Sequence, residues 1–333
     1  MTCRVATAAP RRLDPEVTET VNGPAHWGWD VTTGDAATAR PDVAVVGAGR
    51  AGSALAVALM SAGYRLTAIC SRDPADSTEL AARVGARALA TPLEAAQAAA
   101  LIFLTVPDEA IPELAACLAA ELATGPAPAG ALAGHGVVHC SAAVGLGALT
   151  PLRAAGAAIG CLHPLQALAG QASAPLLRGS LMLVEADPTL VDPLRRLVGD
   201  LDGRLVTLPS GARPLYHAAA VMAGNGSLAL LAAASELLVQ AGLPAPEAER
   251  GAIDLMEGAL SNARRAGARA ALTGPVARGD ASTVARHLAV LSGRPEAGAL
   301  YRALARETLR LAGAEGREEI ARLLDDAVEL SRR

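Results

Sequence analysis

Short apolar runs alternate with helical patterns between residue 42 and about residue 208. The run Val43–Val46 is rich in β-branched residues and is followed by a helical pattern over about 50–61. Further strands are predicted near residues 65–70, 86–89, 101–106, 136–140, 158–162, 180–184 and 204–208, with helical patterns between most of them. Such alternation is typical of a mostly parallel, doubly wound α/β sheet with helices on both faces. We expect this domain over residues 41–209.

The strand patterns stop after Pro209, and an all-α domain is expected over residues 210–333. Its first element is a single long Ala- and Leu-rich helical pattern over 212–241, closed by Gly242 and Pro244. Further helices are predicted near 247–267, 282–291, 295–312 and 317–331. The segment 218–238 is so apolar that we expect it to be buried on all sides, either in the domain core or in a subunit interface.

Residues 1–40 lack sustained periodicity and mix Pro, Gly, Thr and Asp with the only two tryptophans, Trp27 and Trp29. This composition favours a disordered leader. The alternative is that the two tryptophans dock on the folded body.

The overall composition narrows the class of protein. Hydrophobic residues make up 52% of the 333 residues and charged residues 19%, as in a globular protein. The net charge of −4 gives no basic footprint for nucleic acid. No run of about 20 consecutive apolar residues predicts a membrane span, and no secretory segment is visible. The five cysteines are scattered without a C-x-x-C pair, so we expect a reduced cytoplasmic protein with no metal site.

The chain contains no lysine. Mechanisms that need a lysine as Schiff base, general acid or phosphate ligand are therefore excluded.

A glycine-rich turn is the strongest motif. The segment Gly47-Ala48-Gly49-Arg50-Ala51-Gly52 follows a predicted strand directly and opens a predicted helix. In this context Gly47 permits the tight turn, Gly49 lets the backbone approach a pyrophosphate, and Gly52 lets the helix pack close to the strand. The helix N-terminus then offers free N–H groups to the phosphates. The α/β domain is therefore predicted to be a Rossmann dinucleotide-binding domain.

The end of the second strand favours NADP(H) over NAD(H). NAD enzymes usually place an acidic residue there, whereas this chain has Ser71 and Arg72. The planar guanidinium of Arg72 can pair with a 2′-phosphate, and Ser71 can donate to it. Asp73 lies close by and weakens the inference, and a solvated arginine is the alternative.

Three further strand ends are predicted to meet at the same edge of the sheet. After the fourth strand, the backbone of Thr105, Val106 and Pro107 is expected to contact the nicotinamide ribose. Ser141 after the fifth strand and His163 at the end of the sixth are candidate substrate-site residues, since His can move protons near neutral pH. His139 lies inside its strand and is expected to be a hydrogen-bonded core histidine.

The start of the long helical pattern carries two more candidates. His217 and Asn225 are eight residues apart and share one face of the predicted helix. Polar groups on an apolar helix need partners when buried. Substrate and cofactor are candidate partners, and a structural hydrogen bond is the alternative.

With these motifs, the chain resembles a family of bacterial Rossmann-like proteins whose C-terminal helical domain, of unknown function, belongs to the phosphogluconate dehydrogenase C-terminal-like superfamily. The resemblance covers about residues 40–315. It rests on the segments 45–52, 70–72, 105–108, 138–141, 162–166, 215–225 and 272–280. Relatives in the wider clan include β-hydroxyacid dehydrogenases, ketopantoate reductase, pyrroline-carboxylate reductase and prephenate dehydrogenase. The resemblance implies hydride transfer between a nicotinamide and a substrate in a cleft between the domains, and a homodimer that packs the helical domains together.

These features lead to the hypothesis of an NADP(H)-dependent oxidoreductase that reduces a small carbonyl or imine compound. His217 would donate the proton, Asn225 would orient the substrate, and Ser141 and His163 would line the opposite wall. β-Hydroxyacid dehydrogenases and ketopantoate reductase use a lysine near the position of His217, so the chain departs from both, although an unconventional ketopantoate reductase stays an option. The alternatives are a catalytically inactive NADP(H) sensor or scaffold, and an interaction protein without cofactor.

Overall fold

The computed structural model describes residues 40–124, 132–313 and 315–330. The expected leader, with both tryptophans, lies outside the described residues. The chain divides by its internal contacts into two compact units, Met1–Ala220 and Val221–Arg333. We describe each unit by itself.

The first unit is built on an eight-stranded sheet with the order β3-β2-β1-β4-β5-β6-β7-β8. Strands β6 and β7 pair antiparallel, and every other neighbouring pair is parallel. The expected mostly parallel, doubly wound sheet is therefore confirmed. The strands are β1 (Val43–Val46), β2 (Leu66–Cys70), β3 (Arg87–Ala88), β4 (Leu101–Leu104), β5 (Gly136–His139), β6 (Ala158–Pro164), β7 (Leu181–Ala186) and β8 (Arg204–Val206).

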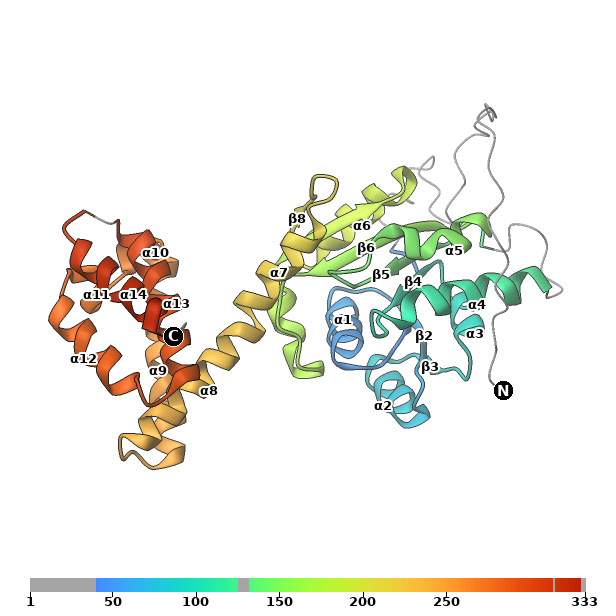
Figure 1. Cartoon of the computed structure of the whole chain (residues 1–333). Helices are drawn as coiled ribbons and strands as arrows, with labels where there is room; N and C mark the ends of the chain where they lie inside the picture. Colours follow the sequence, from blue (N-terminus) through green and yellow to red (C-terminus); the bar gives the residue numbers. More distant parts are fainter. Residues whose placement is uncertain (1–39, 125–131, 314, 331–333) are drawn as a thin grey trace, which may run out of the picture. The chain divides into compact units, whose positions relative to one another are not determined.

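Helices cover both faces of this sheet, as its continuous apolar strands require (Figure 1). On one face, Val43 and Val45 of β1 pack in a core with α1 (Arg50–Ser61), α2 (Pro74–Val84) and α6 (Pro188–Asp200). On the other face, Ala44 and Val46 pack with α3 (Pro92–Gln97), α4 (Ala110–Thr124) and α5 (Thr150–Ala154). Two 3₁₀ segments, η2 (Leu146–Leu149) and η3 (Gln171–Leu177), complete the layers, and η3 packs on α1.

The strand register brings the carboxyl ends of the parallel strands to one edge. Val46 pairs with Leu104, Leu104 with His139, and His139 with Cys161. The chain continues from β1 to β2 on one side and returns to β4 on the other. This reversal creates the crevice in which open α/β sheets bind ligands.

The long helical pattern forms α7 (Arg213–Ala223) and α8 (Asn225–Gln240), with Gly224 between them at φ −90° and ψ −83°. The expected helix is confirmed apart from this irregular glycine. None of the residues of α7 and α8 is buried within the described chain, so burial in the domain core is wrong for this segment. Burial in a subunit interface stays a prediction.

By length and composition, the helical stretch Arg213–Gln240 could cross a membrane. The stretch contains no run of about 20 consecutive apolar residues, because isolated polar residues such as Asn225 and Ser227 interrupt it. Helix α9 (Ala245–Ala266) packs along α8 and carries many charged residues, including Glu249, Arg250 and Asp254. This charged neighbour favours a helix in water or in a protein interface over one surrounded by lipid.

The second unit contains α8, α9 and five further helices within the described residues. These are α10 (Ala268–Ala271), α11 (Pro275–Arg278), α12 (Ala281–Leu291), α13 (Pro295–Ala312) and α14 (Glu318–Leu330). Its apolar core joins α11 to α14 through Val276, Val284, Ala305, Leu309, Ile320 and Leu324. Helix α8 contributes no buried residue to this core.

Candidate functional site

The glycine turn between β1 and α1 contains three glycines in different environments. Gly47 has φ +111°, and a Cβ there would lie 2.7 Å from the carbonyl carbon and oxygen of Thr105. A Cβ on Gly52 would lie 1.9 Å from the Gly47 carbonyl oxygen, so the helix and the turn touch directly. A Cβ on Gly49 would meet no atom within 4 Å. The fold therefore requires glycine at positions 47 and 52, because a Cβ there would clash with the backbone. Gly49 has no such contact and leaves open space beside the start of α1.

The open space meets unpaired backbone donors. Gly49 precedes the first residue of α1, and no side chain caps this helix end within the described residues. The first amides of a helix have no partner inside the helix and carry partial positive charge. The arrangement fits the pyrophosphate of a dinucleotide. Ala48, Arg50 and Ala51 complete the exposed or half-buried rim of this turn.

Thr105, after β4, holds the glycine turn in place. Its Oγ1 donates to the Gly47 carbonyl over 2.7 Å, and its backbone N–H donates to the Val46 carbonyl over 2.8 Å. Val106 packs against the core, and Pro107 is exposed at the sheet edge. The side chain of Thr105 thus shapes the turn, while backbone contact of this segment with a nicotinamide ribose stays a prediction.

The end of β2 leaves Arg72 available for a ligand. Arg72 is exposed and forms no ion pair within the described part of the chain, and Ser71 beside it is half-buried. The carboxylate of Asp73 accepts from the Ala75 N–H over 2.9 Å and caps α2. The acidic side chain that weakened the sequence argument therefore has a structural role in the helix start.

His139, at the end of β5, is fully buried. Its Nδ1 accepts from the Ser141 N–H over 3.2 Å, so its proton is on Nε2. That buried Nε2 has no partner among the described residues. Burial, with Arg213 second, lowers the pKa of His139 to about 4. The expectation of a hydrogen-bonded core histidine is thus only half correct, because the ring nitrogen that donates is left unpaired.

Ser141 shapes the turn after β5. Its Oγ accepts from the N–H groups of Ala143 and Val144 over 3.1 and 3.0 Å. Its hydroxyl hydrogen is left for one donated bond. The residue is buried. Ser141 therefore combines a turn-forming role with a single oriented donor at the sheet edge.

His163, near the end of β6, contacts α7. Its Nδ1 lies 2.8 Å from the Oη of Tyr216, and the two rings pack edge to face with centroids 5.6 Å apart. Burial, followed by His217 and Arg213, lowers the pKa of His163 to about 4. Burial also raises the pKa of Tyr216. Near neutral pH the pair is a neutral imidazole hydrogen-bonded to a protonated phenol.

Arg213 anchors the start of α7 to this edge. Its guanidinium forms an ion pair with Glu185 of β7. It also donates to the backbone carbonyls of Ser141 and Ala142 over 3.3 and 3.4 Å. The Arg213 side chain is 13% exposed. Because Tyr216 is three residues further on, it lies on the same side of the helix as this anchor.

The two predicted helix residues fall in different units. His217 belongs to α7 in the first unit, is half-buried, and lies close enough to His163 to lower its pKa. Asn225 opens α8 in the second unit. Of the four predicted catalytic residues, the first unit therefore holds Ser141, His163 and His217.

The prediction omitted Tyr216 and Arg213 as site residues. Both belong to the segment Arg213–His217, where a cation and an aromatic hydroxyl stand three residues apart at the start of an apolar helix. That spacing could have indicated a helix end directed at the sheet. It could not show that the partners are Glu185 and His163.

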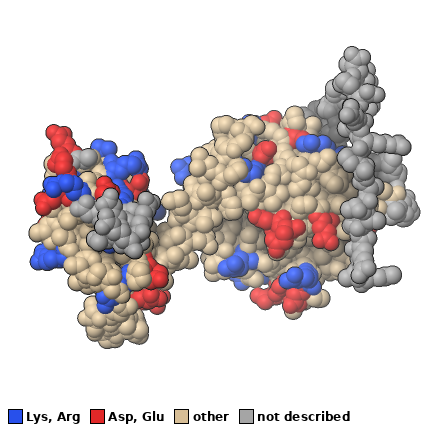
Figure 2. Space-filling view, viewed as in Figure 1, with Lys and Arg blue, Asp and Glu red and all other residues tan. Residues whose placement is uncertain are grey.

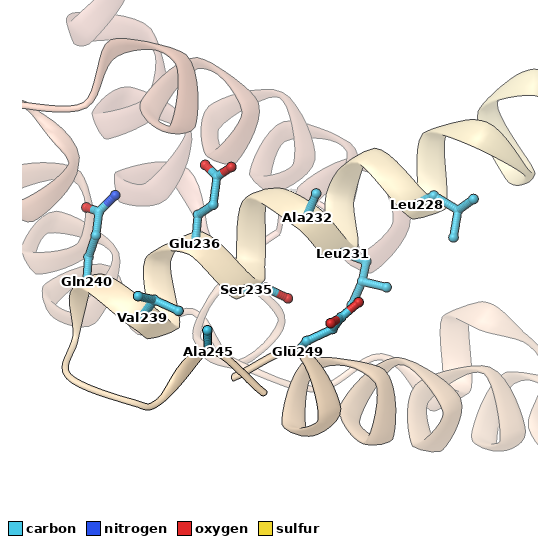
Figure 3. Close-up of a pocket in the computed structure, with 9 residues that line it drawn as sticks. All are labelled: Leu228, Leu231, Ala232, Ser235, Glu236, Val239, Gln240, Ala245 and Glu249. Carbon is cyan, nitrogen blue, oxygen red and sulfur yellow. The ribbon is translucent and has the colours of Figure 1, made fainter. Parts of the chain in front are cut away.

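A hollow lies within the helical unit, between α8 and α9 (Figure 3). Its volume is about 640 Å³, and its lining is mostly apolar. Figure 3 shows Leu231 and Ser235 of α8 on the side that faces Glu249 of α9. The Oγ of Ser235 is buried without a partner among the described residues. No cluster of His, Cys, Asp or Glu that could hold a metal occurs in the described ranges.

Two family models match the sequence. Residues 28–164 match a Rossmann-like domain, and residues 180–308 match a domain of unknown function, DUF2520. A comparison with curated proteins finds no match.

Several solved structures share the fold. A protein described as a candidate NADP oxidoreductase from Bacteroides fragilis has 23% identity and a TM-score of 0.65, covering 81% of this chain and 98% of its own. A pyrroline-5-carboxylate reductase from Coxiella burnetii has 17% identity and a TM-score of 0.55, covering 84% and 99%. A reductive aminase from Aspergillus terreus, in complex with NADPH and ethyl-5-oxohexanoate, has 19% identity and a TM-score of 0.51, covering 88% and 96%. At these identities the similarity shows the fold alone.

Proposed function

The chain combines a Rossmann-like domain, matched over residues 28–164, with a C-terminal domain of unknown function, DUF2520, matched over residues 180–308. From this premise we propose that it is an NADP(H)-dependent oxidoreductase that reduces a small carbonyl or imine compound. The glycine turn carries the proposal. Gly47 and Gly52 are packed against the chain itself, while Gly49 and the uncapped start of α1 are open to a ligand. The names of the structural relatives, an NADP oxidoreductase, a pyrroline-5-carboxylate reductase and a reductive aminase in complex with NADPH, support the same class of reaction.

NADP(H) is proposed over NAD(H) because of the end of β2. Arg72 and Ser71 are available there, and Asp73, the nearest carboxylate in sequence, is engaged in capping α2. A guanidinium can bind the 2′-phosphate through two parallel hydrogen bonds. A bound nicotinamide would supply the hydride, and this chain would supply the proton and the orientation of the substrate.

The polar side chains at the carboxyl edge would serve the substrate. Ser141 has one oriented hydroxyl hydrogen, and His163 is neutral near pH 7. His217 as proton donor and Asn225 as orienting group stay predictions from the sequence.

The experiment is an NADPH oxidation assay with 2-oxo acids (ketopantoate among them), aldehydes and cyclic imines, paired with thermal unfolding in NADPH and NADH. We expect NADPH to raise the unfolding midpoint and at least one substrate to be reduced. Stabilisation by NADPH with no oxidation of any compound would favour a sensor or scaffold. No stabilisation by either dinucleotide would favour an interaction protein without cofactor.

We also propose that the apolar surface of α8 and α9 packs against a second copy of this chain. No charged residue occurs from residue 214 to residue 235, and the α7–α8 stretch is largely uncharged in the space-filling view (Figure 2). Leu228 of α8 and Leu255 and Leu260 of α9 are 67%, 76% and 67% exposed. Large exposed apolar patches are rare on monomers and mark interfaces.

A further inference from the structure

We infer that Tyr216 donates the proton in the proposed reduction and that His163 positions and reprotonates it. The inference rests on the proposed function and assigns to Tyr216 the role that the sequence alone gives to His217. Its basis is the 2.8 Å contact between the Tyr216 Oη and the His163 Nδ1 at the end of β6.

The position of Tyr216 is fixed from two sides. Arg213, one turn earlier, attaches α7 to Glu185 and to the Ser141 carbonyl. The edge-to-face packing on His163 holds the phenol ring itself. His217, by contrast, is half-buried and makes no hydrogen bond within the described residues. A proton donor must be held at a fixed position to act in the transition state, and Tyr216 meets this condition.

His163 suits a relay because it stays neutral. The groups that face it are Tyr216, His217 and Arg213 on α7, and Asp108 after β4. A neutral ring with its proton on Nδ1 donates to the Tyr216 oxygen, and the phenol hydrogen is then free for the substrate. A histidine with an ordinary pKa would change its charge in the working pH range, and the acidity of the Tyr216 phenol would then change with pH. Burial lowers the pKa of His163 and keeps the ring neutral over this range.

The proton steps balance. As the substrate carbon receives a hydride, its oxygen or nitrogen takes the proton from the Tyr216 Oη. The phenolate that forms takes the Nδ1 proton of His163 while the His163 Nε2 takes one proton from the solvent, so that no imidazolate forms. The ring then carries its proton on Nε2, and exchange with the solvent returns the proton to Nδ1 before the next turnover. One solvent proton is consumed for each hydride transferred, and both side chains return to their starting forms.

The test compares Tyr216→Phe with His217→Ala, using the substrate found in the NADPH oxidation assay. We expect Tyr216→Phe to lower kcat on the order of 100-fold or more, as for loss of a general acid, with NADPH affinity unchanged. His217→Ala should change kcat by less than about 10-fold on the same scale. A Tyr216→Phe enzyme with more than half of the original kcat would overturn the inference, as would the opposite ranking of the two variants. If the original protein reduces nothing, the proposed function fails instead.

A second measurement does not depend on turnover. In ¹⁵N-histidine NMR spectra of the free protein, the Nδ1 resonance of His163 should change in Tyr216→Phe and stay unchanged in Leu215→Ala, which alters an exposed neighbour. An Nδ1 resonance unaffected by Tyr216→Phe would show that the pair does not form, and would overturn the inference. His163→Asn, which can keep an acceptor or donor near the Nδ1 position, should restore part of the kcat lost in His163→Ala.

Discussion

At the scale of the residue, one hydrogen-bonding atom decides what each side chain at the sheet edge can do. The Nδ1 of His139 is engaged by the Ser141 N–H, whereas the Nδ1 of His163 is engaged by a phenol. Two histidines with similarly low pKa values therefore differ in role. His139 presents a buried, unpaired Nε2, and His163 connects the sheet to Tyr216.

The two histidines predict a pH dependence of stability. Their pKa values of about 4 in the folded protein lie below the ordinary 6.5 of the unfolded chain. As the pH falls from 6.5 towards 4, the unfolded chain binds protons that the folded protein does not. The free energy of unfolding should fall in this window, by up to about 3 kcal/mol per histidine. Urea unfolding at successive pH values measures this, and His139→Gln should remove about half of the loss.

The three glycines predict separable effects. Gly52→Ala places a Cβ against the Gly47 carbonyl and should lower the free energy of unfolding by roughly 1–3 kcal/mol. Gly49→Ala meets no atom and should leave stability nearly unchanged, while lowering NADPH affinity on the order of 10-fold by crowding the pyrophosphate. Urea unfolding and NADPH titration distinguish the two. Equal loss of stability in both variants would contradict the assignment.

We expect Arg72 to determine the preference for NADPH over NADH. Arg72→Ala should weaken NADPH binding on the order of 10-fold or more, because a charge-assisted pair with the 2′-phosphate is lost. NADH affinity should change little. The control is Arg83→Ala, which removes an exposed arginine that belongs to α2. Equal weakening of both dinucleotides would show that Arg72 does not select between them.

At the scale of the element, the fold could be predicted from periodicity because strands and helices of the first unit are short and sharply bounded. The strands at 43–46 and 101–104 are buried apolar runs, and Asp73 and Thr91 mark helix starts by capping. The exposure of α7 and α8 could not be predicted. An apolar helix has the same pattern whether it lies in a core or awaits a partner, and only the packing of the rest of the chain distinguishes them.

Helix α7 predicts a structural role for Arg213. Arg213→Ala removes the ion pair to Glu185 and two donated backbone bonds at once. We expect the free energy of unfolding to fall by roughly 1–3 kcal/mol, as for half-buried charged hydrogen bonds. Arg195→Ala, which removes an exposed i,i+3 pair with Asp192, should cost less than about 1 kcal/mol. Thermal and urea unfolding compare the two variants, and equal effects would show that α7 is not held by Arg213.

At the scale of the whole molecule, the polar site residues and the exposed apolar helices lie in different parts of the sequence. The glycine turn, His163 and Tyr216 all belong to the first unit, whereas Leu228 and Leu255 belong to the second. The sequence could identify the cofactor turn because it is local. It could not identify the His163–Tyr216 contact, because these residues are 53 positions apart.

The exposed helices predict the state of assembly. Light scattering should give twice the 33.4 kDa mass of one chain. Leu228→Asp with Leu255→Asp should reduce the mass to that of one chain, because charges would enter the apolar contact. Leu176→Asp in the first unit, at a leucine that is 48% exposed, should leave the mass unchanged. A native mass of one chain at micromolar concentration would rule out the proposed interface.

The hydrogen bond from the Thr105 Oγ1 to the Gly47 carbonyl has a consequence for the order of folding during synthesis. The Gly47 carbonyl takes its bond from a residue made 58 positions later, and β1 lies between β2 and β4. A nascent chain that has left the ribosome only as far as β3 therefore holds the whole glycine motif but lacks the strand that shapes it. We expect affinity for NADPH to arise only once β4 emerges, so that stalled chains ending before and after this strand differ sharply in nucleotide binding.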